Sequence, residues 1–213
     1  MMEVAMPFFV LEGLAKTLSS FSKACLFMPL AEPVLREDDI IFDLRFPKSA
    51  GHLASWKSAT FGHVRAGGAR VHQGWDFFAM SGTICFAVSG GWVAKVYESK
   101  DYGQVLVLRL LGLPNAPAQI FAAYAHLSKV TVAPGQFVKG GEAVAESGMT
   151  GNAKEFPRYP HLHFEFRSEP RPGQGLAGRI DPAKIFGDPQ DYRPRLFHGD
   201  AVTDRIARAA RTG

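Results

Sequence analysis

The stretch PHLHFEFR, residues 160–167, decides the fold prediction. Side chains on a β-strand alternate between two faces, so His161, His163 and Glu165 share one face if this stretch is a strand. The apolar side chains between them share the opposite face, which suits a core: Leu162, Phe164 and Phe166. Two imidazoles on one strand face can converge on one metal ion, or on an ion and its water.

Short apolar runs continue on both sides of this strand, from about residue 46 to residue 187. Examples are TICFAV, QVLVLRLL and EAVAES, and turn sequences rich in Gly, Pro, Asn and Asp separate them. Runs at this spacing are typical of an all-β domain. We therefore expect a mostly β fold, in the form of a sheet, a sandwich or a barrel.

Two flanking segments differ from this pattern. In residues 1–45, apolar side chains recur at helical spacing from Phe8 to Cys25, which predicts an amphipathic helical leader. Such a helix either packs on the main domain or docks to a partner or a secretion apparatus. Residues 188–213 read as a C-terminal tail, either a frayed end or an extended stretch followed by a short basic helix.

Composition sets the broad class. The chain has 213 residues, a formal net charge of +4 and 46% hydrophobic residues, which fits one domain with appendages. The mild positive charge suits an anionic partner, but Lys and Arg are scattered and not interleaved with aromatic residues, so we expect no nucleic-acid partner. The two cysteines, Cys25 and Cys85, do not make a disulfide framework, and their pairing stays open.

The sequence gives no sign of an integral membrane segment. No apolar run reaches the ~18–20 residues that a transmembrane helix needs. The N-terminal stretch lacks a basic first region and is interrupted by Glu3 and Glu12, so it fits a signal peptide poorly. We expect synthesis in the cytoplasm, with export by another route.

Two further motifs carry metal-binding or proton-transfer side chains. In VHQGWD, His72 and Asp76 flank Gly74, which permits a tight turn that brings imidazole and carboxylate to one ion. In YAHLS, His126 closes a predicted strand over residues 120–126 and shares its face with Tyr124. Each motif is weak alone, because lone histidines are usually surface residues.

Together the motifs offer five candidate side chains for one zinc ion per chain. They are His72, Asp76, His126, His161 and His163. Catalytic zinc keeps three protein ligands and one open position, so at least one of the five is not a ligand. A neutral imidazole beside the metal can serve in proton transfer or stabilise an oxyanion. Spacing alone does not assign the roles, and cobalt or manganese would also suit such donors.

In order and content these blocks resemble the lysostaphin-type (LytM-like) zinc metallopeptidases, which cut peptide cross-links in bacterial peptidoglycan. The resemblance runs from about Gly62 to Ile185 and includes HQGWDFF, AAYAHLS, VTVAPGQFVKGGEAVAESGMTGN, PHLHFEFR and the following IDP. It implies an antiparallel β-sheet groove domain and three zinc ligands, His72, Asp76 and His163. The two non-ligand catalytic histidines would then be His126 and His161.

Other expectations depend on this resemblance. Glu165 becomes a candidate partner for a metal-bound histidine, with a salt bridge to Arg167 or Arg109 as the plainer alternative. Some relatives place a tyrosine shortly before the first ligand, but residues 62–71 contain none, which leaves part of the transition-state stabilisation unassigned. The reshaped segment before His161 favours D-alanyl–diaminopimelate cross-links over glycine bridges as substrate.

The poor fit to a signal peptide adds an effector hypothesis. A cytoplasmic peptidoglycan hydrolase could be delivered as an antibacterial toxin into the periplasm or cell wall of a rival. Residues 1–45 would then meet a secretion apparatus or an immunity protein.

Two non-enzymatic alternatives stay open. One is a catalytically silent wall-binding regulator or amidase activator, although the resemblance has all five positions intact. The other is a lipoyl-like binding module, suggested by VTVAPGQFVKGGEAVAESG. There Lys139 lacks the setting of a modified lysine, and such a module has no use for His161 and His163.

Overall fold

The computed structural model describes residues 26–31, 56–113, 116–155 and 160–192. Within these ranges antiparallel strands dominate and helices are short. The strands are β1 (Gly62–Arg65), β2 (Arg70–His72), β3 (Trp75–Phe78), β4 (Ile84–Phe86), β5 (Gly91–Ser99), β6 (Gly103–Leu110), β7 (Phe121–Val130), β8 (Phe137–Val138), β9 (Ala143–Ser147), β10 (His161–Arg167) and β11 (Arg179–Ile180). The helices are η1 (Trp56–Ala59), η2 (Ala66–Gly68), η3 (Gly151–Glu155), α2 (Ala183–Phe186) and η4 (Pro189–Tyr192), where η denotes 3-10 geometry.

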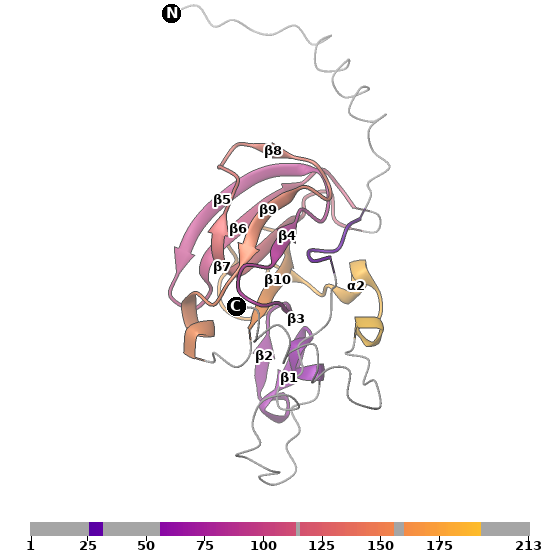
Figure 1. Ribbon diagram of the computed structural model, residues 1–213. Coiled ribbons are helices and arrows are strands. Elements are labelled where there is room, and N and C mark those ends of the chain that lie inside the picture. Colours follow the sequence, from indigo (N-terminus) through magenta and orange to yellow (C-terminus); the bar gives the residue numbers. More distant parts are fainter. Residues whose placement is uncertain (1–25, 32–55, 114–115, 156–159, 193–213) are drawn as a thin grey trace, which may run out of the picture.

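Nine of these strands form one antiparallel sheet. Its main path runs β11-β10-β7-β6-β5-β8, while β3 pairs with β10 and β9 joins β4 to β7. Strands β1 and β2 form a separate two-stranded sheet at one end of the curved main sheet (Figure 1). The predicted mostly β, antiparallel class is confirmed.

Strand β10 alternates as its sequence predicted. Leu162, Phe164 and Phe166 are fully buried in the larger hydrophobic core. Phe186 of α2 packs against both phenylalanines, with ring centroids 5.5 Å and 5.0 Å apart. Burying each such side chain stabilises a fold by roughly 1.5–3 kcal/mol. This apolar anchoring fixes which face of β10 carries the histidines.

The predicted leader is only partly described. The helical stretch between Phe8 and Cys25 lies outside the described residues. Residues 26–31 contain no helix and lie against the sheet. The Phe27 amide donates to the Val88 carbonyl, and the Phe86 amide donates to the Pro29 carbonyl, both at 2.8 Å. Leu30 is buried in the hydrophobic core. This part of the segment therefore packs on the main domain. Among the described helices, all are too short to cross a bilayer.

Gly74 is required by a close approach of two strands. It was expected to permit a turn, yet its φ lies outside the left-handed region. A Cβ at this position would lie 2.1 Å from the Phe164 carbonyl oxygen and 2.8 Å from Cγ of Glu165. Any side chain at this position would push His72 and Asp76 away from β10.

We expect Gly74→Ala to destabilise the fold by about 1–3 kcal/mol, because the added methyl group meets backbone that cannot yield. Gly173→Ala is the matched control, since a Cβ there meets nothing within 4 Å. Urea unfolding monitored by circular dichroism compares the two variants. Equal free energies of unfolding would contradict the close-approach explanation.

Candidate metal centre

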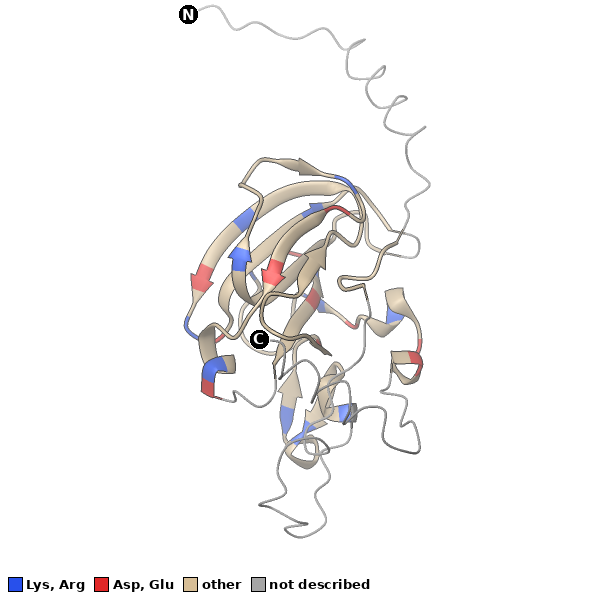
Figure 2. Ribbon diagram, viewed as in Figure 1, with Lys and Arg blue, Asp and Glu red and all other residues tan. Residues whose placement is uncertain are grey.

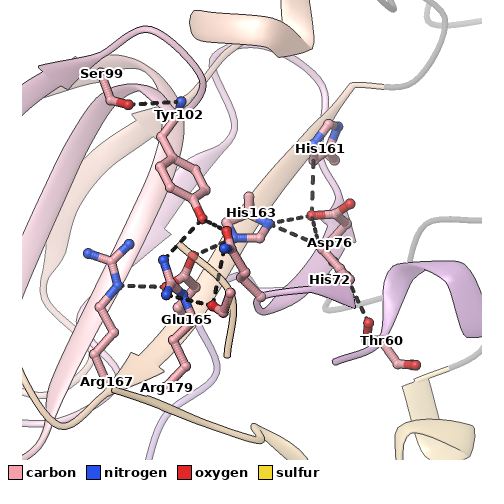
Figure 3. A network of polar contacts seen from close by, with 12 residues as sticks. Thr60, His72, Asp76, Ser99, Tyr102, His161, His163, Glu165, Arg167 and Arg179 are labelled. Atoms are coloured by element: carbon pink, nitrogen blue, oxygen red, sulfur yellow. Dashed lines mark hydrogen bonds and ion pairs between the residues drawn. The ribbon is translucent and has the colours of Figure 1, made fainter. Parts of the chain in front are cut away.

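Three donor atoms from three strands converge at one point. His72 ends β2, Asp76 lies on β3, and His163 lies directly opposite Asp76 in the β3–β10 register. Asp76 Oδ1 lies 3.1 Å from His72 Nε2 and 2.8 Å from His163 Nδ1, and these two nitrogens are 3.1 Å apart. All three side chains are buried, and Figure 3 shows them meeting at Asp76.

Hydrogen bonds on the far side of each imidazole set the tautomers. His72 Nδ1 donates to the Thr60 carbonyl at 2.8 Å, and His163 Nε2 donates to Glu165 Oε1 at 2.9 Å. Neutral imidazole has one N–H and one lone pair, so His72 Nε2 and His163 Nδ1 both present lone pairs. Two lone pairs and a carboxylate oxygen facing one another repel unless a cation lies between them.

The electrostatics agree with a cation-binding point. Burial would raise the pKa of Asp76, but His72 and His161 outweigh it and hold that pKa well below its usual range. Burial lowers the pKa of His72, and Asp76 offsets only part of this. For His163 burial is outweighed by the carboxylates of Asp76 and Glu165 beside its two ring nitrogens, which raise its pKa. Anionic groups on both sides of His163 favour positive charge there.

The donor set fits zinc. Two imidazoles and one carboxylate are common zinc ligands, at about 2.0–2.2 Å each, and a tetrahedral arrangement separates the donors by about 3.3 Å. The observed separations of 2.8–3.1 Å are close to that value. Three protein ligands leave a fourth position open, as in catalytic zinc sites.

The remaining two predicted histidines lie beside the three donors. His161 Nε2 is 3.8 Å from Asp76 Oδ1, farther than either ligand nitrogen. The His126 ring lies 4.9 Å from the ring of His161 and 6.0 Å from that of His163, between centroids. The structure therefore brings all five predicted site residues together, with His126 and His161 forming a pair beside the donor triad.

His126 reaches this position through an unusual backbone conformation. Its φ is 60°, in the left-handed region, which costs a non-glycine residue of order 1–3 kcal/mol. The prediction that His126 ends its strand is wrong, because β7 continues to Val130. The shared face with Tyr124 is also wrong: Tyr124 is buried in the core against Phe164, whereas the positive φ turns His126 toward the other histidines.

The chemistry of His126 follows from its surroundings. Its Nδ1 donates to the Thr150 carbonyl at 2.9 Å, which leaves Nε2 with a lone pair. Burial lowers the pKa of His126 to about 3, with His161 and His163 adding to the effect. The ring is neutral at neutral pH and can accept a proton.

Residues 70–175 match the family model described as peptidase family M23. The chain carries an M23 peptidase domain. An uncharacterized metalloprotease of Haemophilus influenzae is 39% identical over 105 residues, which are 49% of this chain and 20% of that protein. The peptidoglycan DD-endopeptidase ShyB of Vibrio cholerae is 30% identical over 128 residues, 60% of this chain and 28% of that protein.

Among solved structures, the catalytic domain of the antimicrobial peptidase lysostaphin from Staphylococcus simulans is similar at 28% identity and a TM-score of 0.46. The match covers 58% of this chain and 85% of that domain. The chain spans less than a third of the length of the two curated relatives. The matched M23 region includes all five predicted site residues.

A buried ion-pair network contacts His163 on the side of its ring away from Asp76. The sequence indicated only part of this network. Glu165 Oε2 accepts hydrogen bonds from Arg167 Nε at 2.7 Å and from Arg179 Nε at 2.9 Å, while Oε1 holds His163 (Figure 3). Both anticipated roles of Glu165, partner of a histidine and partner of Arg167, therefore occur together. Hydrogen bonds from His163 and Arg167 outweigh burial and lower the pKa of Glu165, which is ionised.

Arg179 and Tyr102 were not anticipated. Arg179 Nη1 donates to the carbonyls of Gly173 and Gly175 at 2.8 Å, so it fastens the loop between β10 and β11 to Glu165. Tyr102 stacks near His163, with ring centroids 5.2 Å apart, and its hydroxyl bonds to Gln73. The Tyr102 contacts join segments far apart in the chain, the Arg179 contacts depend on the fold of one loop, and no local motif signals either residue.

We expect Glu165→Gln to weaken zinc binding of the M23 domain by about 10–100-fold, because the outer partner of a ligand histidine sets its orientation and basicity. Glu146→Gln is the control, since Glu146 makes an exposed ion pair with Lys129. Competition with a chromophoric chelator measures affinity, under conditions where circular dichroism shows both variants folded. Equal affinities would show that Glu165 does not act on the metal.

Proposed function

We propose that this chain is a zinc-dependent endopeptidase that hydrolyses peptide cross-links of peptidoglycan. The observation that carries the proposal is the convergence of His72, Asp76 and His163 beside two further histidines within an M23 domain. The peptidoglycan DD-endopeptidase name of one relative supports the substrate class. Peptidoglycan lies in the periplasm or cell wall, so the proposed activity belongs there.

The side chains of the site have different roles. His72, Asp76 and His163 would hold zinc, which when bound polarises the scissile carbonyl and lowers the pKa of an attacking water. His126, neutral and with a free lone pair at Nε2, accepts a proton during attack. Once His126 Nε2 carries this proton it can donate a hydrogen bond to the developing oxyanion, together with His161, whose ring lies against that of His126.

We further propose D-alanyl–diaminopimelate cross-links as the preferred substrate. Among the described residues, Arg65, Arg167 and Arg179 form ion pairs with two carboxylates, Asp76 and Glu165, so these groups together carry excess positive charge. Diaminopimelate cross-links carry carboxylates next to the scissile region, whereas glycine bridges are uncharged. This charge distribution favours the anionic substrate.

A binding-only role is the second candidate. A silent regulator or a lipoyl-like module requires neither a neutral proton acceptor nor three converging ligands. The two readings differ in turnover, which is directly measurable. The effector hypothesis depends on the N-terminal segment and remains a prediction from the sequence.

The decisive assay incubates the purified protein with cross-linked sacculi, with and without a chelator, and identifies the fragments by mass. We expect chelator-sensitive loss of cross-linked dimers and release of monomers with free D-alanine termini. Intact sacculi from protein with confirmed bound zinc would overturn the proposal and favour a binding role. Cleavage within glycine bridges would overturn the substrate preference alone.

Variants separate the roles in the same assay. Asp76→Ala should lose zinc and activity together. His126→Gln should keep zinc and lose about 10²–10⁴-fold in rate, the usual contribution of a general acid or base. His63→Gln is the matched control, because His63 is an exposed histidine of β1 that bonds only to Gly68 among the contacts described.

A further inference from the structure

Arg65 touches the metal centre from outside the residues that match the M23 family model. It is the last residue of β1, and β1 pairs with β2, which ends at His72. Its Nη2 donates to Asp76 Oδ2 at 2.5 Å, and its Nε donates to the Ser58 carbonyl at 3.0 Å. The guanidinium is thus held at two points while its side chain stays 23% exposed.

The two oxygens of Asp76 have different partners. Oδ1 faces the ligand nitrogens of His72 and His163, at 3.1 Å and 2.8 Å. Oδ2 is engaged by Arg65. A carboxylate can bind a metal through one oxygen or both, and an arginine bound to the second oxygen favours metal binding through the first.

The geometry of the guanidinium suits this task. Its N–H groups are fixed in one plane, so donation to Ser58 through Nε sets the direction in which Nη2 points. Lysine, a point charge on a flexible stem, cannot reproduce both bonds at once. The short bond between a charged donor and a charged acceptor is of the stronger class of hydrogen bonds.

We propose that Arg65 is a positioning residue that holds Asp76 as a single-oxygen ligand and so keeps one coordination position open for water and substrate. The inference rests on the proposed metal centre. In this role Arg65 limits the number of protein atoms bound to the metal, and it does not contact the reacting atoms. A second Asp76 oxygen on the metal would occupy space that the reaction needs.

Arg70 provides a matched control. It lies opposite Arg65 in the same two-stranded sheet, is exposed, and makes no side-chain contact among those described. Strands β1 and β2 contain two residues of the types Lys, Arg, Asp and Glu, namely Arg65 and Arg70 (Figure 2). Replacing either arginine by alanine therefore changes the charge of this sheet by the same amount. Only the Arg65 substitution removes the contact with Asp76.

The test uses cobalt(II) in place of zinc, because its visible absorption weakens when coordination rises from four to five. The full chain, Arg65→Ala, Arg65→Lys and Arg70→Ala are each loaded with cobalt, and spectra are recorded without substrate. We expect weaker bands for both Arg65 variants and an unchanged spectrum for Arg70→Ala. With saturating zinc, both Arg65 variants should release sacculus fragments about 10–100-fold more slowly.

The outcomes separate this inference from the proposed function. If the unaltered protein binds no cobalt or zinc, the metal centre itself fails. If it binds metal and an Arg65 variant gives an unchanged spectrum, only the role of Arg65 is overturned. If Arg65→Ala does not fold, as judged by circular dichroism, the spectrum of Arg65→Lys decides. Metal binding without sacculus cleavage defeats the endopeptidase proposal, while the spectra still test Arg65.

Discussion

The pairing of β3 with β10 is the constraint on which the rest of the site depends. It places Asp76 directly opposite His163, two residues that are 87 positions apart in the chain. The register is fixed because Phe164 and its apolar neighbours on β10 are buried in the core, and a slip by one residue would turn the histidines into that core. Gly74 allows the two strands to approach closely enough for His72 to join them.

Two separate groups of ion pairs compensate the buried carboxylates around this pairing. Asp76 is engaged by Arg65 on one oxygen, and Glu165 by Arg167 and Arg179 on another side of the centre. A buried carboxylate without such partners would cost several kcal/mol, of the order seen when one member of a buried pair is removed. Compensation keeps both carboxylates ionised. Ionised Glu165 holds the Nε2–H of His163 and directs its Nδ1 lone pair at the centre, while the Thr60 carbonyl does the same for His72.

The sequence predicted the fold class and the membership of the site because both follow from local pattern. Period-two alternation in PHLHFEFR separated the histidines from the core side chains, and β10 shows that separation. His126 was placed among the site candidates by its motif and given its non-ligand role by resemblance, but its geometry was not predictable. A single left-handed residue within β7 reverses the alternation on which a strand prediction relies.

The supporting residues could not be predicted, for a different reason. Arg65, Thr60 and Arg179 act through contacts set by tertiary packing, at sequence separations that no spacing rule covers. Arginine and threonine are also common on surfaces, so their presence carries no signal. Gly74 was correctly singled out, but for a turn, whereas the structure requires it for a close approach.

Anomalous diffraction at the zinc edge, from crystals of the unaltered protein supplied with zinc, tests the central claim most directly. The account predicts one dominant peak within about 2.0–2.2 Å of His72 Nε2, Asp76 Oδ1 and His163 Nδ1. A dominant peak bound by His126 and His161, or no peak between those three donors, would contradict it.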